Sequence, residues 1–221
     1  ARDLDSLMCL FEFEPPLYAD HRTGESLQVH WTGHPLVDRM PNRGPIDPNL
    51  YGLLPGSRDQ ELTRHLAPFV QAASEVRKRQ PDARFRLVGD RERLSIFAPV
   101  PDWIDIVPDI SALRGARAAL SKSGTSTLEL ALMNVPMVVA HRVHPLTYWL
   151  GRLLVRGISH IALPNILAKR EVVPEFVQRF RPAHLADTLR QLPSRQATDL
   201  SALGPGGASQ RAARIVHESW T

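Results

Sequence analysis

The sequence predicts an α/β fold in which a parallel sheet is flanked by helices. Short apolar segments alternate along the chain with longer segments whose apolar residues recur at helical spacing. Two turns, at Gly56 and Gly124, each lie between a predicted strand and a predicted helix. Strands separated by helices pair in parallel, and such sheets bind ligands beyond the carboxyl ends of their strands. A binding site is therefore expected at the two turns.

The best-defined element is a helix predicted from Asp59 to Arg79. Leu62, Leu66, Phe69 and Val76 recur there close to the helical period. Periodicity and flanking prolines or glycines define the other elements. We predict strands at 4–11, 27–31, 51–54, 84–88, 103–107, 118–121, 137–143 and 161–163. We predict further helices at 111–117, 125–133, 145–156, 175–180, 183–192 and 208–220.

The composition is that of a globular protein with a slightly basic balance. Hydrophobic residues make up 43% of the chain, the net charge is +4, and the isoelectric point is about 9.7. This balance suits phosphate-bearing ligands, anionic membrane surfaces or nucleic acid, and equally suits ordinary solubility. The charge alone does not choose among these.

The single cysteine, Cys9, cannot form an internal disulfide and suits a reducing compartment, with the cytosol as the default. Arg152 and Arg156 interrupt the most apolar helix, so no run of about 18 apolar residues predicts a membrane span. The chain begins at Ala1 without a recognisable signal peptide. We expect it to be a piece of a longer sequence.

The turn at residues 123–126 is the strongest candidate for an anion site. A strand that ends in small residues and leads directly into a helix directs several backbone N–H groups at one point. Ser126 and Glu129 also fit the S/T-x-x-E capping pattern, so Glu129 could cap its own helix. The alternative is that Glu129 accepts hydrogen bonds from a sugar diol beside a phosphate.

The turn at residues 55–58 is the second candidate. Ser57 could cap the following helix, with Gln60 completing a capping box. A capped helix end is compatible with a ligand, because the Arg58 guanidinium can grip two phosphate oxygens at once. Neither a Walker loop nor a dinucleotide G-x-G-x-x-G motif is present.

Other chemistry is poorly supported. His30 and His34 are four residues apart, but Gly33 and Pro35 argue against a helix there, so no metal site is expected. The chain contains no G-x-S-x-G motif for a hydrolase. His141 lies near the end of a predicted strand, where we expect a surface histidine or one with its hydrogen bonds satisfied within the fold.

The segment at residues 145–156 predicts a strongly amphipathic helix. Leu146, Trp149, Leu150 and Leu153 share one face, while Arg152 lies on another. Such a face packs against the protein's own sheet or a neighbouring domain, or it enters the interface of an anionic membrane. The sequence leaves both open.

Six motifs stand in a characteristic order between about residues 9 and 178. They are TGHPL at 32–36, LLPGSR at 53–58 with Glu61, SGTSTLE at 123–129, PMVV at 136–139, PLTYWL at 145–150 and LPNILAKREVVPE at 163–175. Together they resemble the second half of lipid-A-disaccharide synthase. The resemblance implies one half of a GT-B fold, which pairs two Rossmann-like domains across a cleft.

The resemblance also implies a function. The family is an inverting glycosyltransferase that needs neither a metal nor a cofactor. It joins UDP-2,3-diacylglucosamine to 2,3-diacylglucosamine 1-phosphate (lipid X) and releases UDP. Its expected partners are therefore these two substrates and an anionic membrane surface, and not nucleic acid. The expected location is cytoplasmic and peripheral at the inner membrane.

By the same resemblance, residues 1–38 are the end of an N-terminal domain that is otherwise missing from the chain. Residues 39–50 are a linker, 51–180 are the UDP-sugar-binding domain and 181–221 are C-terminal helices. The aspartate thought to act as general base belongs to the missing part. The chain alone is therefore expected to bind UDP and could be inactive.

The resemblance places Arg58 and the backbone of Gly56 and Ser57 against the diphosphate or its sugar. Arg58 would stabilise the negative charge that develops on UDP as it leaves. Asn165 and Glu171 would lie in a loop that faces the cleft.

Ser123, Gly124 and Thr125 would supply N–H and hydroxyl donors to the phosphates. Glu129 would accept from the ribose hydroxyls. The segment at 84–101 departs from the family pattern, so donor-sugar contacts are left open there.

Two rival interpretations remain. One is a non-catalytic module that binds a nucleotide sugar or another polyanion. The other is a different GT-B enzyme, such as the N-acetylglucosaminyltransferase of peptidoglycan synthesis or a UDP-N-acetylglucosamine 2-epimerase. The motifs at 145–150 and 162–165 argue against these two enzymes.

Overall fold

The structure is a computed structural model that describes residues 4–19, 27–40, 44–142, 160–196 and 198–219. The chain divides into two compact units. The central unit comprises residues 41–198, and the terminal unit comprises residues 1–40 together with residues 199–221. Each is described by itself.

The central unit is built on a six-stranded sheet in which every neighbouring pair is parallel. Its strand order is β5-β4-β3-β6-β7-β8, so in order of appearance along the chain the strands are arranged 3-2-1-4-5-6. This is the order of the doubly wound dinucleotide-binding fold, whose ligand crevice lies between the first and fourth strands. The strands are β3 (Asp47–Leu54), β4 (Arg84–Val88), β5 (Ile104–Val107), β6 (Ala116–Ser121), β7 (Met137–His141) and β8 (Glu175–Val177).

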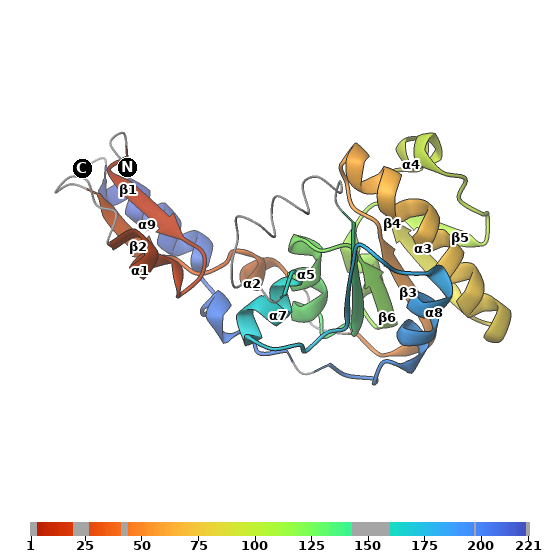
Figure 1. Ribbon diagram of the computed structural model, residues 1–221. Helices are drawn as coiled ribbons and strands as arrows, with labels where there is room; N and C mark the ends of the chain where they lie inside the picture. The colour runs from red at the N-terminus through yellow and green to blue at the C-terminus, as the bar shows by residue number, and fades with distance from the viewer. Residues whose placement is uncertain (1–3, 20–26, 41–43, 143–159, 197, 220–221) are drawn as a thin grey trace. The chain divides into compact units, whose positions relative to one another are not determined.

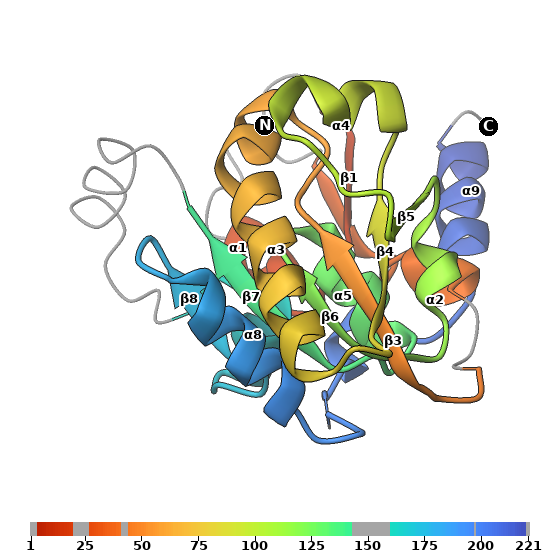
Figure 2. The same cartoon turned by 90° about the vertical axis from the view of Figure 1, so that its right-hand side faces the viewer.

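Helices cover both faces of this sheet (Figures 1 and 2). On one face α3 packs against α8 and α4, and α8 contacts β6 and β7. On the other face α5 packs against β6, β7, α7 and the 3-10 helix η1. Their bounds are α3 (Asp59–Arg79), α4 (Arg91–Phe97), η1 (Ile110–Leu113), α5 (Thr125–Leu132), α7 (Leu163–Ala168) and α8 (Pro182–Gln191).

The core lies between the sheet and the helices because the central strands are apolar on both faces. Leu53, Leu87, Leu120 and Val138 come from four adjacent strands and are fully buried. Parallel sheets covered on both sides favour such continuous apolar strands. The sheet therefore forms a rigid base from which the strand-end turns project.

The terminal unit joins the two ends of the chain. Its parallel strands β1 and β2 pair from Ser6↔Gln28 to Cys9↔Trp31. The Arg211 guanidinium donates to the Thr32 carbonyl oxygen at 2.9 Å. The elements are β1 (Ser6–Cys9), α1 (Glu14–Ala19), β2 (Gln28–Trp31), α2 (Leu36–Arg39), the 3-10 helix η2 (Ser201–Leu203) and α9 (Ala208–Glu218).

Several predicted elements differ from the structure. The predicted strand at 161–163 is wrong, because Pro164 lies in the first turn of helix α7. The predicted helix at 175–180 is wrong, because Glu175–Val177 forms edge strand β8, paired with β7. The short helix α4 was not predicted. The predicted helix at 145–156 lies outside the described residues.

The predicted domain limits also differ in two places. Strand β3 begins at Asp47, inside the segment 39–50 that was predicted as a linker. The segment 181–221 divides between the units: α8 packs in the central unit, while α9 belongs to the terminal unit.

Candidate functional site

A cavity of about 570 Å³ lies beyond the carboxyl ends of the central strands. Its wall includes Leu54 at the end of β3, Val88 at the end of β4, and Lys122 just after β6. This is the position at which the strand order reverses. Open α/β sheets bind their ligands at that point.

Six of the nine residues predicted for the site line this cavity. The turn at 55–58, called the first turn, contributes three and the turn at 123–126, called the second turn, contributes two. Glu129 on α5 is the sixth. These residues are Gly56, Ser57, Arg58, Gly124, Thr125 and Glu129. The fold thus brings together two turns that are far apart in the sequence.

The backbone N–H groups of the first turn donate to a carboxylate of the helix that follows it. Glu61 Oε2 accepts from the backbone N–H of Ser57 at 2.9 Å and of Arg58 at 3.2 Å. The N-cap of α3 is Arg58, so the predicted capping box of Ser57 and Gln60 is wrong and Glu61 performs that role. The Arg58 side chain is 86% exposed and comes within 3.9 Å of Glu61 Oε1.

Glu61 also holds a cation. Lys122 Nζ donates to Glu61 Oε1 at 2.8 Å, and each side chain is only 17% exposed. Burial alone would raise the pKa of Glu61, but hydrogen bonds from Lys122, Ser57 and Arg58 outweigh it and lower that pKa. Glu61 is thus held as a carboxylate beneath the first turn.

The second turn begins its helix differently. Gly124 is the N-cap of α5, at a φ of 156°, and the Thr127 hydroxyl donates to the Gly124 carbonyl oxygen at 2.7 Å. Ser126 is therefore not the N-cap, and the predicted capping box of Ser126 and Glu129 is wrong. The first amides of a helix have no acceptor within the helix, and Thr125 and Ser126, which carry such amides, both line the cavity.

Three predicted residues do not line the cavity. The Ser123 hydroxyl donates to the Ile161 carbonyl oxygen at 2.6 Å. Asn165 is fully buried in α7, so its predicted place in a loop is wrong. Its amide oxygen accepts from the backbone N–H of Val172 and Val173 at 2.7 and 2.9 Å.

Asn165 thus acts as an internal brace for the chain that follows α7. Glu171 lies in that following chain and is exposed, outside the residues that line the cavity. No contact among the described residues gives Glu171 a role at the site.

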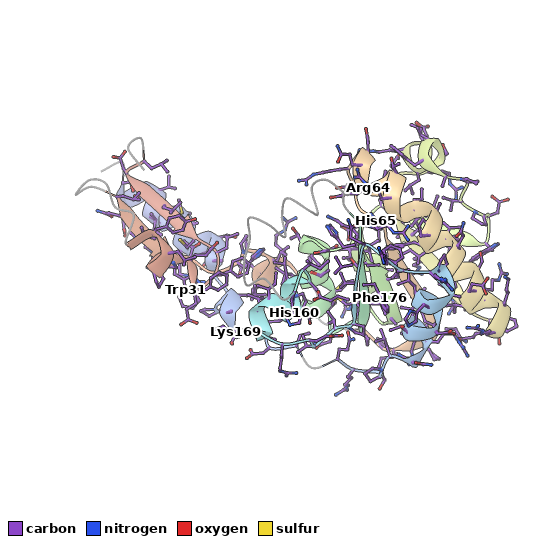
Figure 3. The ribbon with its side chains drawn as sticks, viewed as in Figure 1. Trp31, Arg64, His65, His160, Lys169 and Phe176 are labelled. Atoms are coloured by element: carbon purple, nitrogen blue, oxygen red, sulfur yellow. The ribbon has the colours of Figure 1, made fainter. Side chains whose placement is uncertain are left out.

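Two histidines lie near the Glu61–Lys122 pair. His65 lies on α3 (Figure 3). Its Nε2 accepts from the Arg142 N–H at 2.9 Å, so its Nδ1–H donates to the Glu61 carbonyl oxygen at 2.8 Å. Burial is the main cause that lowers the pKa of His65 to about 4. His141 lies 5.9 Å from it, ring to ring, and burial and the Lys122 charge lower its pKa as well.

The cavity contains charges that the sequence analysis missed. Lys122, Asp90 and Arg93 line it with Glu61. Asp90 caps α4 by accepting from the Arg93 N–H at 2.9 Å. A glycine and an aspartate directly after a predicted strand are the signal that could have found this second capped helix.

Comparison with known proteins identifies the family. Residues 1–194 match the family model described as Lipid-A-disaccharide synthetase. The chain belongs to this family. A lipid-A-disaccharide synthase of Syntrophotalea carbinolica is 33% identical over 244 residues, and one of Geobacter sulfurreducens is 34% identical over 246. These alignments cover 97% and 98% of the chain, which spans 61% and 63% of the relatives' length.

Solved structures agree on the fold of this lipid-A-disaccharide synthase family member. A UDP-GlcNAc 2-epimerase of Methanocaldococcus jannaschii, in complex with UDP-GlcNAc and UDP, superposes with a TM-score of 0.59 at 14% identity, covering 97% of this chain and 61% of that one. S. aureus TarM gives a TM-score of 0.50 at 12% identity, covering 98% and 41%. These likenesses confirm the predicted Rossmann-like half of a GT-B fold.

Two features are absent from the described residues. No group of three or more His, Cys, Asp and Glu side chains there is placed to hold a metal ion. No helix there combines the length and the hydropathy that crossing a bilayer requires.

Proposed function

We propose that this chain is the donor-binding half of a lipid-A-disaccharide synthase. The reaction joins UDP-2,3-diacylglucosamine to 2,3-diacylglucosamine 1-phosphate and releases UDP. The observation that carries the proposal is the cavity at the strand-order reversal, where two helix N-termini and the Arg58 side chain converge in a member of this family.

The diphosphate of the donor is proposed to lie between Arg58 and the second turn. The amides of Thr125 and Ser126 and the N-terminal end of the α5 dipole favour an anion there. Glu129, on the same helix, is proposed to accept from the ribose hydroxyls. The first turn contributes the Arg58 side chain rather than its amides, because Glu61 already accepts from those.

This arrangement supports departure of UDP as the leaving group. Negative charge that develops on the β-phosphate is stabilised by a guanidinium and by oriented backbone dipoles that are already in place. The acceptor hydroxyl needs a base. We assign that base to the part of the whole protein that this chain does not span.

The acylated substrates make an anionic membrane surface the proposed place of reaction. The enzyme would then act as a peripheral protein on the cytoplasmic side of the inner membrane. We propose that this chain alone binds the donor, whereas turnover requires the rest of the protein as well.

The test is the thermal shift that UDP produces. UDP should raise the melting temperature of the chain, and ADP should raise it much less if the pocket selects uridine. Arg58→Ala should remove most of the UDP shift, because a hydrogen bond to a charged group contributes roughly 1.5–3 kcal/mol.

Arg195→Ala is the matched control, since Arg195 is an exposed arginine of the central unit that does not line the cavity. It should leave the UDP shift unchanged. Equal stabilisation of wild type and Arg58→Ala by UDP would contradict the proposed site. Equal melting-temperature shifts with UDP and ADP would mean that the cavity binds polyanions in general and does not select uridine.

A further inference from the structure

Of the cations that line the cavity in the described part of the chain, Lys122 is the least exposed. Its side chain is 17% exposed, whereas that of Arg58 is 86% and that of Arg93 is 48% exposed. Lys122 and Arg93 are each paired with one carboxylate, Glu61 at 2.8 Å and Asp59 at 2.7 Å, so exposure is what separates them. A charge shielded from water interacts more strongly with a nearby anion. Lys122 is therefore the cation from which a bound anion gains most.

The backbone at Lys122 is fixed between the two central strands. Its N–H donates to the Leu54 carbonyl oxygen at 2.9 Å, directly after strands β3 and β6 end. The side chain consequently starts from the strand-order reversal itself. It lies between the first turn, through Glu61, and the second turn, through Gly124.

The second turn is shaped around the ammonium group. A Cβ atom built on Gly124 would lie 2.6 Å from Lys122 Nζ, closer than any real Cβ contact. Glycine at 124 thus leaves the space that the ammonium occupies. This observation is independent of the Glu61 contact and puts the cation directly against the N-terminus of α5.

Among the described residues, the charged side chains of the cavity wall are three cations and three anions: Arg58, Arg93, Lys122, Glu61, Asp90 and Glu129. An ammonium has three N–H donors, and Glu61 Oε1 is the one acceptor found for Lys122 Nζ in the described part of the chain. Donors of Lys122 are therefore left for an incoming anion.

We infer that Lys122 binds the diphosphate of the donor nucleotide and that Glu61 is the positioning residue that holds it for this contact. The inference rests on the proposed function, whose site it completes. Phosphate would receive N–H donors from the second turn and from Lys122 at the same point. Glu61 keeps the ammonium in place by a carboxylate that is itself anchored to the amides of the first turn.

The test is a calorimetric titration of the chain with UDP and with uridine. Lys122→Met keeps the length of the side chain and removes its charge. It should weaken UDP binding about ten- to hundredfold, the loss typical of one charge-assisted hydrogen bond, and leave the weak binding of uridine unchanged. Lys122→Arg should retain part of the affinity.

Lys78→Met is the matched control. Lys78 forms an exposed ion pair with Glu75 on α3, at 2.6 Å, and does not line the cavity. This variant should bind UDP as the wild type does. If the wild type fails to bind UDP at all, the proposed function fails; if the wild type binds and Lys122→Met binds equally well, only the role of Lys122 is overturned.

A double variant separates ligand binding from folding, because Lys122→Met leaves the Glu61 charge shielded and unpaired. Lys122→Met with Glu61→Gln removes both charges and retains an acceptor for the amides of Ser57 and Arg58. It should regain stability and still bind UDP weakly. Recovery of wild-type UDP affinity in this double variant would mean that Lys122 merely neutralises Glu61, and would overturn the inference.

Discussion

The first turn, at Gly56, and the second turn, at Gly124, both join the end of a parallel strand to the start of a helix. The amides of the first turn donate to Glu61, an anion of the same helix. In the second turn, the Thr127 hydroxyl donates to the Gly124 carbonyl oxygen, so this hydrogen bond does not involve a backbone N–H group. Of the two helix N-termini, only that of the second turn therefore keeps its first amides clear of a capping carboxylate, which is why the proposed phosphate contact is assigned to it.

The largest effect that tests this comparison is expected from Glu61→Ala. It leaves the Lys122 ammonium shielded and unpaired and removes the acceptor of two amides. Removing one partner of such a pair costs about 3 kcal/mol of unfolding free energy. Chemical denaturation with circular dichroism measures it.

Two control variants give the scale against which the stability loss of Glu61→Ala is compared. Glu75→Ala breaks an exposed ion pair on the same helix and should cost less than about 0.5 kcal/mol. Thr127→Val removes the buried hydroxyl of the second turn and should cost about 1 kcal/mol. A Glu61→Ala cost no greater than that of Thr127→Val would mean that the two turns are secured equally.

The second effect is a dependence of the unfolding free energy on pH, caused by His65 beneath the first turn. His65 is neutral in the fold, with a pKa of about 4, while an unfolded histidine has a pKa near 6.5. Between these values the unfolded chain binds more protons, so stability falls as the pH drops from about 6.5 to about 4. The loss attributable to His65 is at most about 3 kcal/mol. His141, Glu61 and Lys122 are the titratable groups that act on it.

Melting temperatures measured across this pH range test the assignment. His65→Gln should be less stable than the wild type at pH 7 and should show a shallower decline below pH 6.5. His184→Gln, which changes an exposed histidine of α8, should keep the wild-type slope. An unchanged slope in His65→Gln would assign the decline to other groups, such as Glu61.

A third, smaller effect is the difference between the stability losses at the two glycines, about 2 kcal/mol. Both have a positive φ, which alanine adopts at a cost of about 1 kcal/mol. A Cβ on Gly56 would lie 2.4 Å from Glu61 Oε2 and 2.6 Å from Glu61 Cβ. Glu61 is anchored and cannot move aside cheaply, whereas the Lys122 ammonium at Gly124 is the far end of a flexible side chain.

Gly56→Ala should therefore cost about 3 kcal/mol and Gly124→Ala about 1 kcal/mol in the same denaturation assay. Gly124→Ala should instead weaken UDP binding, because it displaces Lys122. The reverse order of stability losses would contradict the difference in how the two turns are anchored.

The sequence predicted the parts of this molecule that depend on local pattern. Helix α3 has the predicted bounds because its apolar residues follow one period over its whole length. The resemblance of the two turns to one family placed Gly56 and Gly124 at a common site, and the strand order brings them there. Periodicity and motif order therefore sufficed for the main fold and the position of the cavity.

What failed depends on contacts between distant segments. Edge strand β8 is three residues long and exists because Glu175 pairs opposite Val139. Asn165 was predicted to lie in a loop because its hydrogen-bond partners, the backbone groups of Val172 and Val173, cannot be read from the sequence. They come within reach only once the chain after α7 has turned back. The place of Lys122 required knowledge that Glu61, 61 residues earlier, lies within 2.8 Å.

The smallest effect concerns Ser123, the residue of the second turn that was expected to bind phosphate. Its hydroxyl donates to the Ile161 carbonyl oxygen at 2.6 Å and joins the second turn to the chain before α7. Ser123→Ala should cost about 1 kcal/mol of unfolding free energy and leave UDP affinity within about twofold. Ser95→Ala, at an exposed serine of α4 that also donates to a carbonyl oxygen, should cost less than half as much. A tenfold loss of UDP affinity in Ser123→Ala, without a loss of stability, would mean that this hydroxyl turns to the ligand, and the second turn would then give up an internal contact to bind it.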